Sequence, residues 1–146
     1  MRKEQMSRPL SAKEHALLKF LIEANEPLYG DRTNQWKTQV ETCLVREIDS
    51  PYFLAVVHEE NIERAGRDSI TLGYELVGVD HGVPVLIYAV AMKTPSDYFI
   101  DIFNVDRLDG EPLVNYPEAG DGLMIVERNK RVGGADLRHL YGKSGS

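Results

Sequence analysis

The hydrophobic positions follow two different periods along the chain. Between residues 12 and 24, apolar residues recur every three or four positions, the spacing of one face of an α-helix. Ser11 and Glu14 have the spacing of a capping box, which marks the start of a helix. Asn25 and Pro27 mark its end. The pattern therefore predicts one helix near the N-terminus.

The next segment, residues 26–39, shows no clear period. It contains Pro27, Gly30 and Asp31, residues that are common in turns. We interpret this segment as an irregular connection. Trp36 is the large apolar residue within it, and we expect its side chain to anchor the connection by packing.

From residue 40 the helical period disappears, and β-branched and aromatic residues gather in short runs between turn residues. These runs predict five strands, over residues 40–48, 53–58, 70–79, 83–92 and 98–105. The Asp80-His81-Gly82 loop indicates a tight hairpin in which Gly82 adopts a positive φ. Because short loops join only antiparallel neighbours, we expect an antiparallel meander.

Together these elements predict an α+β fold, with the N-terminal helix packed on an antiparallel meander of about five strands. An irregular C-terminal segment follows, with a further short strand at 123–126 and two helical turns at 135–141. The sequence predicts a single domain over residues 1–146, with its core at about 8–127. We expect the basic extension, 128–146, to be partly disordered.

The later strands are apolar at nearly every position, which is typical of a sheet covered on both faces. One helix covers only part of one face. Either the C-terminal segment or a second subunit must therefore cover the other face, and a homodimer is a reasonable expectation.

Charge is unevenly distributed over the 146 residues, whose net charge is −6. Residues 40–127 hold seventeen acidic and five basic residues, a net charge of −12, whereas residues 128–146 are basic. The acidic region should repel phosphate backbones, so we expect no nucleic-acid partner. The longest apolar run has ten residues, about half of a membrane-spanning helix. We expect no membrane association and a cytoplasmic location.

No motif for a metal or cofactor is present. The four histidines are far apart in the sequence, and Cys43 has no second cysteine beside it, so the spacing of a zinc site is missing. No glycine-rich nucleotide-binding loop can be placed between a strand and a helix. We therefore predict no metal, no cofactor and no catalytic residue, with Cys43 as a small core residue.

The candidate site residues are polar groups placed among apolar ones, because burying a carboxylate is costly. They are Glu75, Asp101 and the Asp80-His81 pair. If Glu75 and Asp101 share a cavity, they could act as an acid and a base. The alternative is a solvent-facing stripe, or cross-strand pairing with Lys93 or Arg107. Two aromatic residues complete the candidate pocket or partner-binding set, namely Tyr88 and Phe103.

Two stretches carry a family resemblance. Residues 73–85 contain Glu75, a gap of four residues, and then Asp-His-Gly-Val-Pro-Val, while residues 99–106 resemble the strand that ends this pattern. The opening Arg8-Pro9-Leu10-Ser11 also fits. The chain resembles small uncharacterised bacterial proteins of a domain-of-unknown-function family, some of them similar to immunity proteins of toxin systems. This resemblance implies one helix on an antiparallel sheet and no assigned catalytic residue.

Three functions follow as hypotheses. The leading one is a non-enzymatic, immunity-like binding module whose acidic surface engages a basic protein partner. The second is a small-molecule-binding or catalytic domain with a pocket between helix and sheet, lined by tyrosines and holding Glu75 or Asp101. The third is a purely structural dimer.

Overall fold

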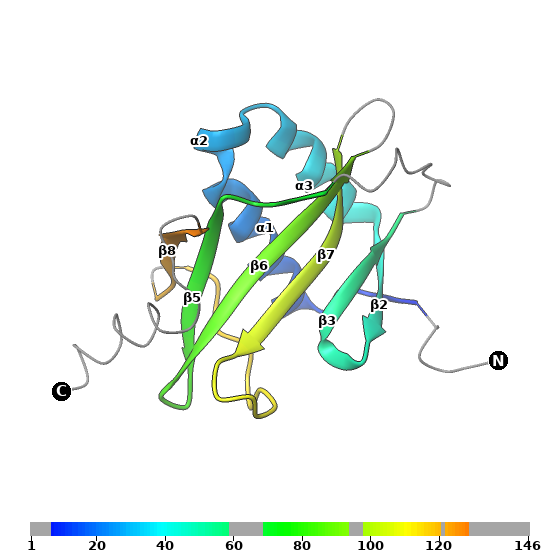
Figure 1. Cartoon of the computed structure of the whole chain (residues 1–146). Coiled ribbons are helices and arrows are strands. Elements are labelled where there is room, and N and C mark those ends of the chain that lie inside the picture. The colour runs from blue at the N-terminus through cyan, green and yellow to red at the C-terminus, as the bar shows by residue number, and fades with distance from the viewer. Residues whose placement is uncertain (1–6, 59–68, 94–97, 121, 129–146) are drawn as a thin grey trace.

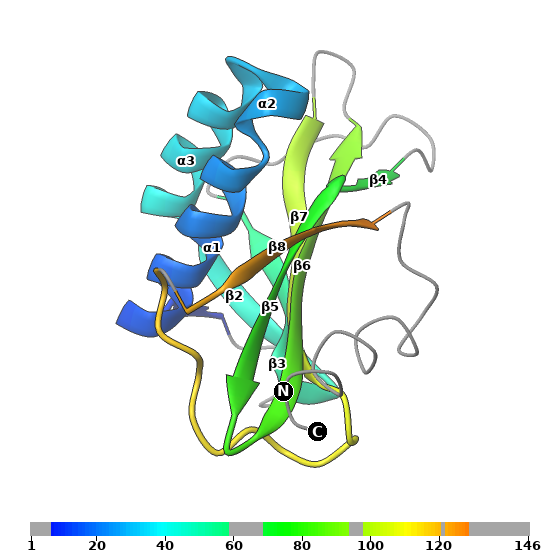
Figure 2. The same cartoon turned by 90° about the vertical axis from the view of Figure 1, so that its left-hand side faces the viewer.

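The protein has an α+β fold in which helices lie on one face of a single antiparallel sheet, as predicted. A computed structural model describes residues 7–58, 69–93, 98–120 and 122–128. Figure 1 shows the sheet from its other face, with the helices behind it, and Figure 2 shows the two layers edge-on.

The first helix, α1 (Ala12–Ala24), begins and ends where the sequence predicts. The Ser11 hydroxyl accepts a hydrogen bond from the Glu14 N–H at 3.2 Å, and the Glu14 carboxylate accepts one from the Ser11 N–H at 2.8 Å. Both halves of the capping box are therefore present. Asn25 follows the helix and is fully buried.

The predicted connection at 26–39 is wrong, because two helices occupy this part of the chain. They are α2 (Glu26–Tyr29) and α3 (Arg32–Thr42). Pro27 lies in the first turn of α2, where its missing N–H costs nothing. Thr33, Trp36 and Val40 are buried and recur at helical spacing in α3. The turn residues thus separate short helices instead of forming one long loop.

Eight strands form one sheet. They are β1 (Arg8–Pro9), β2 (Leu44–Ile48), β3 (Ser50–Val57), β4 (Ser69–Thr71), β5 (Tyr74–Asp80), β6 (Val83–Lys93), β7 (Tyr98–Arg107) and β8 (Met124–Glu127). Their order is β1-β2-β3-β7-β6-β5-β8, every recorded pair is antiparallel, and β4 pairs with β6 beside this path. The additional strand expected at 123–126 is present as β8.

Two details of the predicted strands are wrong. The first predicted strand starts too early, since residues 40–42 belong to α3. The meander is also incomplete, because β3 pairs with β7 instead of with the strand that follows it in sequence. The order contains two runs of strands that are neighbours both in sequence and in the sheet, β1-β2-β3 and β5-β6-β7.

The strand expected at 70–79 is divided into β4 and β5 at Gly73. A side chain at Gly73 would lie 2.5 Å from the Leu28 side chain of α2, so glycine lets the backbone approach this helix closely. The Asn25 side chain fixes the start of β5, because it donates to the Tyr74 carbonyl at 3.0 Å and accepts from the Tyr74 N–H at 2.9 Å.

The main core lies between the helices and the sheet. Trp36 is fully buried there, as expected of an anchor, and its ring N–H donates to the Tyr98 carbonyl at 3.2 Å. The buried Cys43 belongs to the same core, and burial raises the pKa of its thiol to about 11. A smaller cluster of buried apolar residues, around Val77 and Leu86, lies on the opposite face of the sheet. We call this the open face because none of the described helices covers it.

Some predictions fall outside the described residues. These are the turn at 94–97, the loop at 59–68, the helical turns at 135–141 and the basic extension beyond Arg128. Within the part of the chain that the structure describes, no helix is long and apolar enough to cross a membrane.

Candidate functional site

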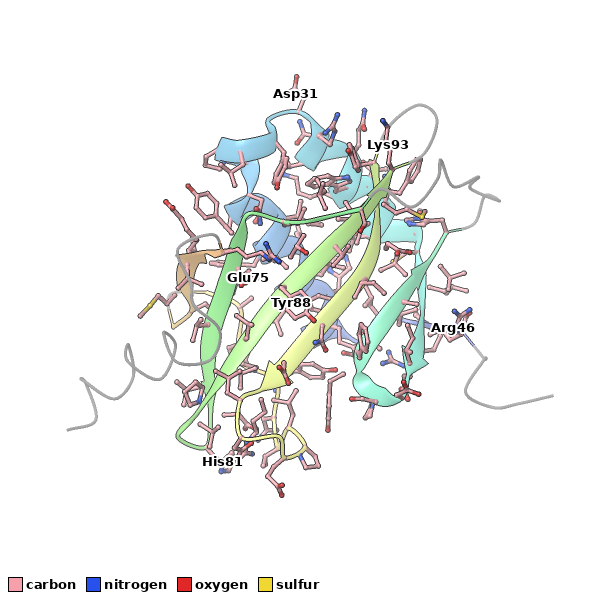
Figure 3. All side chains as sticks on the ribbon, in the orientation of Figure 1. Asp31, Arg46, Glu75, His81, Tyr88 and Lys93 are labelled. Atoms are coloured by element: carbon pink, nitrogen blue, oxygen red, sulfur yellow. The ribbon has the colours of Figure 1, made fainter. Side chains whose placement is uncertain are left out.

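Two of the predicted site residues, Glu75 and Tyr88, meet on the open face of the sheet. Leu76 pairs with Ile87, so the preceding Glu75 of β5 is level with Tyr88 of β6, as Figure 3 shows. Glu75 is buried, and its carboxylate lies 3.8 Å from the Arg128 side chain. The Tyr88 hydroxyl accepts a hydrogen bond from the Asn104 side chain at 3.1 Å.

Asp101 does not join Glu75 in one cavity. It lies on β7, at a register shift where Val90 pairs with Ile102 and Ala91 with Ile100. Strand β6 separates β5 from β7, and Tyr88, which is level with Glu75, pairs with Asn104. Asp101 therefore lies two strand spacings across the sheet and three residues along it from Glu75. This register does not produce the hypothetical acid and base pair.

Asp80 holds a loop in place. It ends β5, is buried, and accepts hydrogen bonds from the N–H groups of Val114 and Asn115 at 2.7 and 3.1 Å. Arg107 contacts the same carboxylate at 3.2 Å. Burial acts to raise the pKa of Asp80, but these hydrogen bonds and the Arg107 charge together lower it below its ordinary value. Asp80 therefore fastens the β7–β8 connection to the sheet.

The remaining predicted residues lie elsewhere. His81 is exposed in the β5–β6 turn, at the lower end of the sheet in Figure 3. Phe103 is fully buried in the core on the helix side, so it lines no open pocket. The six residues predicted from the sequence are thus distributed over the core, a turn and the open face, and they do not form one site.

A cleft lies where β3 and β7 separate. The recorded pairs between these strands extend only from Ala55 with Ile102 to Phe53 with Asn104. Beyond Phe53 a cleft of about 460 Å³ opens, a volume within the range of ligand sites. The β2–β3 turn, the end of β7 and the β7–β8 connection surround it at the lower edge of the sheet in Figure 1.

The cleft is acidic. Its lining includes three acidic residues, Asp49, Asp106 and Glu111. Its one basic side chain, Arg107, is engaged by Asp80 at 3.2 Å and by Asp109 at 3.0 Å. Burial raises the pKa of Asp106, because a carboxylate that has lost water is harder to ionise. A cation that enters the cleft would relieve this cost.

Aromatic side chains form part of the cleft wall. Tyr52 and Phe53 line it, and the Tyr52 hydroxyl donates to the Leu113 carbonyl of the opposite wall at 3.2 Å. Aromatic rings can contact the aliphatic stem of a lysine or arginine side chain and attract its charge. Among the described residues, no group of three or more His, Cys, Asp or Glu side chains is placed to hold a metal ion.

The sequence analysis missed the acidic cleft residues. Asp49, Asp106 and Glu111 follow or end strands, where acidic residues are common, so their identity alone carries little information. Only their positions at strand ends could have indicated the cleft, because successive hairpins bring strand ends back to the same edge of a sheet. The pairing of β3 with β7 is what places Asp49 across from Asp106, and the local sequence does not encode that pairing.

Comparison with known proteins finds no family model, no curated protein and no solved structure that matches this chain.

Proposed function

We propose that the protein is a non-enzymatic binding module that captures a basic segment of a partner protein in the cleft between β3 and β7. The observation that carries this proposal is the charge of the cleft, which three acidic residues line and whose one arginine is already paired. The function is the immunity-like role that the sequence resemblance implies.

Long-range charge supports the same function. Residues 40–127 carry a net charge of −12, which attracts a basic protein from a distance and speeds its association. Proteins that grip phosphate backbones are basic, so an acidic binder can cover the surface they use. Burial raises the pKa of Asp106, and a nearby cation would offset this desolvation cost.

The packing of the core favours a surface site over an internal pocket. Leu17, Leu21 and Trp36 are fully buried between the helices and the sheet. The cleft lies outside this layer, at the edge of the sheet. We therefore rank partner binding above the alternative of a small-molecule pocket between helix and sheet.

We also propose that the open face forms a homodimer. Val79 follows Val77 by two residues and Met124 pairs with Val77, so both side chains lie on the face of the Val77 cluster. They are 44% and 41% exposed, which leaves apolar surface for a second copy.

A pair of charge-matched variants tests partner binding. The cleft variant combines Asp49→Asn, Asp106→Asn and Glu111→Gln. The control combines three exposed positions in or next to the helices, Glu23→Gln, Glu26→Gln and Asp31→Asn. Both raise the net charge by the same amount. The probe is a labelled octapeptide of alternating lysine and valine, and its affinity is measured by fluorescence anisotropy at several salt concentrations.

We expect the cleft variant to bind the peptide about tenfold more weakly, while the control changes by less than about twofold. Binding should also weaken as salt rises, because the Debye length falls from about 10 Å at 0.1 M to about 3 Å at 1 M. Equal losses in both variants would show that only net charge matters. An absence of binding to the unchanged protein would contradict the proposed function.

A further inference from the structure

The sheet is buried on both faces in the middle of β5 and β6. Residues 75–78 of β5 and 85–87 of β6 are buried without interruption, and successive strand residues point to opposite faces. The helices explain this burial on their own side only, as Figure 2 shows. On the open face Glu75, Val77 and Leu86 are 1%, 0% and 5% exposed. Burial at consecutive positions is typical of a sheet that is covered on both sides.

The covered area on the open face has a definite edge. Val79 follows Val77 by two residues on the same strand and face, and yet its side chain is exposed. Met124, which pairs with Val77, is exposed as well. The cover therefore stops short of the surface that we assign to the dimer. The burial is present within one chain, so a second copy does not produce it.

The chain leaves the sheet beside this covered area. The Arg128 N–H donates to the Gly73 carbonyl at 2.8 Å, just before β5 begins, and the Arg128 side chain lies 3.8 Å from the Glu75 carboxylate. Residues 129–146 follow, and they include four basic residues and one acidic residue. Residues 59–68 include four acidic and two basic residues, so a buried carboxylate would repel that segment. Charge therefore favours the C-terminal segment as the cover.

The sequence of the C-terminal segment fits an apolar patch. The two helical turns predicted at 135–141 would place Leu137, Leu140 and Tyr141 on one side, because these residues are three and four positions apart. The two glycines that precede these turns allow the chain to reverse its direction. A basic stretch is thus followed by a short segment with one apolar side.

We infer that residues 129–141 fold back over the open face and bind there. In this arrangement their apolar side packs on the cluster around Val77 and Leu86, and the basic residues that follow Arg128 lie near Glu75. Cationic neighbours offset the cost of burying this carboxylate. The inference concerns a surface other than the cleft, so it does not depend on the proposed function.

A spin label tests this position in the full chain. His139→Cys places a nitroxide on the segment, on the side opposite to the apolar residues. Cys43 is buried, so the new cysteine takes the label. Two further variants of the labelled chain are compared. Leu137→Lys puts a charge on the apolar side, and the matched control Ala135→Lys puts the same charge on the opposite side. The readout is the broadening of methyl signals by NMR.

We expect the label to broaden the methyl signals of Val77 and Leu86 at least tenfold more than those of Leu17 and Leu21, which are buried on the helix side. Leu137→Lys should reduce this broadening at least fivefold, because a charge on the apolar side releases the segment. The control should change it by less than about twofold. Leu137→Lys alone should also lower the midpoint of urea unfolding.

Three results would overturn the inference. If the Val77 and Leu86 signals are not broadened, another part of the chain covers the open face. If Val105 and Leu113 are broadened instead, the segment occupies the acidic cleft and competes with the partner there. If Val77 is broadened only when a labelled chain is mixed with an isotope-enriched chain that carries no label, the segment covers a second copy. The first and third results leave the proposed function unchanged.

Discussion

Glu14 connects three parts of the chain through one buried carboxylate. It accepts hydrogen bonds from Arg8 at 2.8 and 2.9 Å, from the Ser11 N–H at 2.8 Å and from the Tyr116 hydroxyl at 2.7 Å. Burial acts to raise the pKa of Glu14, but these bonds outweigh it and lower the pKa. Burial and the same carboxylate raise the pKa of Tyr116. The network ties β1 and the β7–β8 connection to the start of α1.

Replacing Glu14 by Gln should therefore destabilise the fold. We expect Glu14→Gln to lower the free energy of unfolding by about 2 kcal/mol, the usual range for hydrogen bonds to a charged group. Urea unfolding at pH 7 measures this change. The matched control is Glu23→Gln on the exposed side of the same helix, which should cost less than about 0.5 kcal/mol.

The same residue predicts a pH dependence. Because the folded pKa of Glu14 is depressed, its contribution is present above the unfolded value of about 4.3 and is lost as pH falls through the folded pKa. The stability gap between the unchanged protein and Glu14→Gln should thus narrow below about pH 5. A gap that stayed constant down to pH 3 would show that the charge of Glu14 contributes nothing.

Only the local half of this network could be predicted from the sequence. Ser11 and Glu14 are three residues apart, so helix geometry alone brings them together. Tyr116 is 102 residues from Glu14, and their contact depends on where the β7–β8 connection crosses the molecule. No local hydrophobic pattern in the sequence predicts the course of that connection.

Among the elements, the β5–β6 hairpin has a turn whose sequence is not ideal. Its two central residues, His81 and Gly82, have φ values of 50° and 83°. Positive φ at both positions is the geometry of a type I′ turn, in which Asn-Gly is the favoured pair. The Gly82 conformation was predicted, but His81 carries the strain of a residue with a side chain in the left-handed region.

We expect His81→Asn to stabilise the protein by about 0.5 to 1 kcal/mol, because asparagine tolerates positive φ better than histidine. Thermal unfolding at fixed pH measures the change. His81→Val is the contrasting variant, and it should destabilise the protein because a β-branched residue disfavours this conformation. If both variants shift the midpoint in the same direction, the turn assignment is wrong.

Prediction of the elements succeeded where a strong local signal was present. The period of α1 and its capping box located the helix within a residue. The α3 helix was missed because its apolar residues are few, with Thr33, Trp36 and Val40 as its buried positions. Turn residues at its start also obscured the helical spacing of its apolar positions. In the structure α3 packs against α1.

For the whole molecule, the decisive feature that the sequence could not reveal is the pairing of β3 with β7. It joins residues 53–55 to residues 102–104, which are far apart in the sequence, and no local pattern predicts it. The cleft and its acidic residues follow from that pairing. The faces of β6 were equally hidden, because residues 85–91 are apolar or aromatic throughout and show no alternation. In the structure Ile87 faces the core, while Tyr88 faces the open side.

The open face gives the last prediction, a homodimer at micromolar concentration. Three helices cover one face of the sheet, while Val79 and Met124 keep 44% and 41% of their surface exposed on the other. Burial of this apolar surface would stabilise a two-fold interface by about 25 cal/mol per Å². Light scattering measures the mass of the unchanged protein and of the double variant Val79→Lys with Met124→Lys.

We expect the unchanged protein to be a dimer and the double variant a monomer with a similar unfolding midpoint, because both positions are exposed in the single chain. Leu28→Lys is the control, since Leu28 is 49% exposed on α2 in the helical layer. This variant should remain dimeric, since its charge lies away from the open face. A monomeric unchanged protein would rule out the dimer, and loss of the dimer in Leu28→Lys alone would place the interface on the helices.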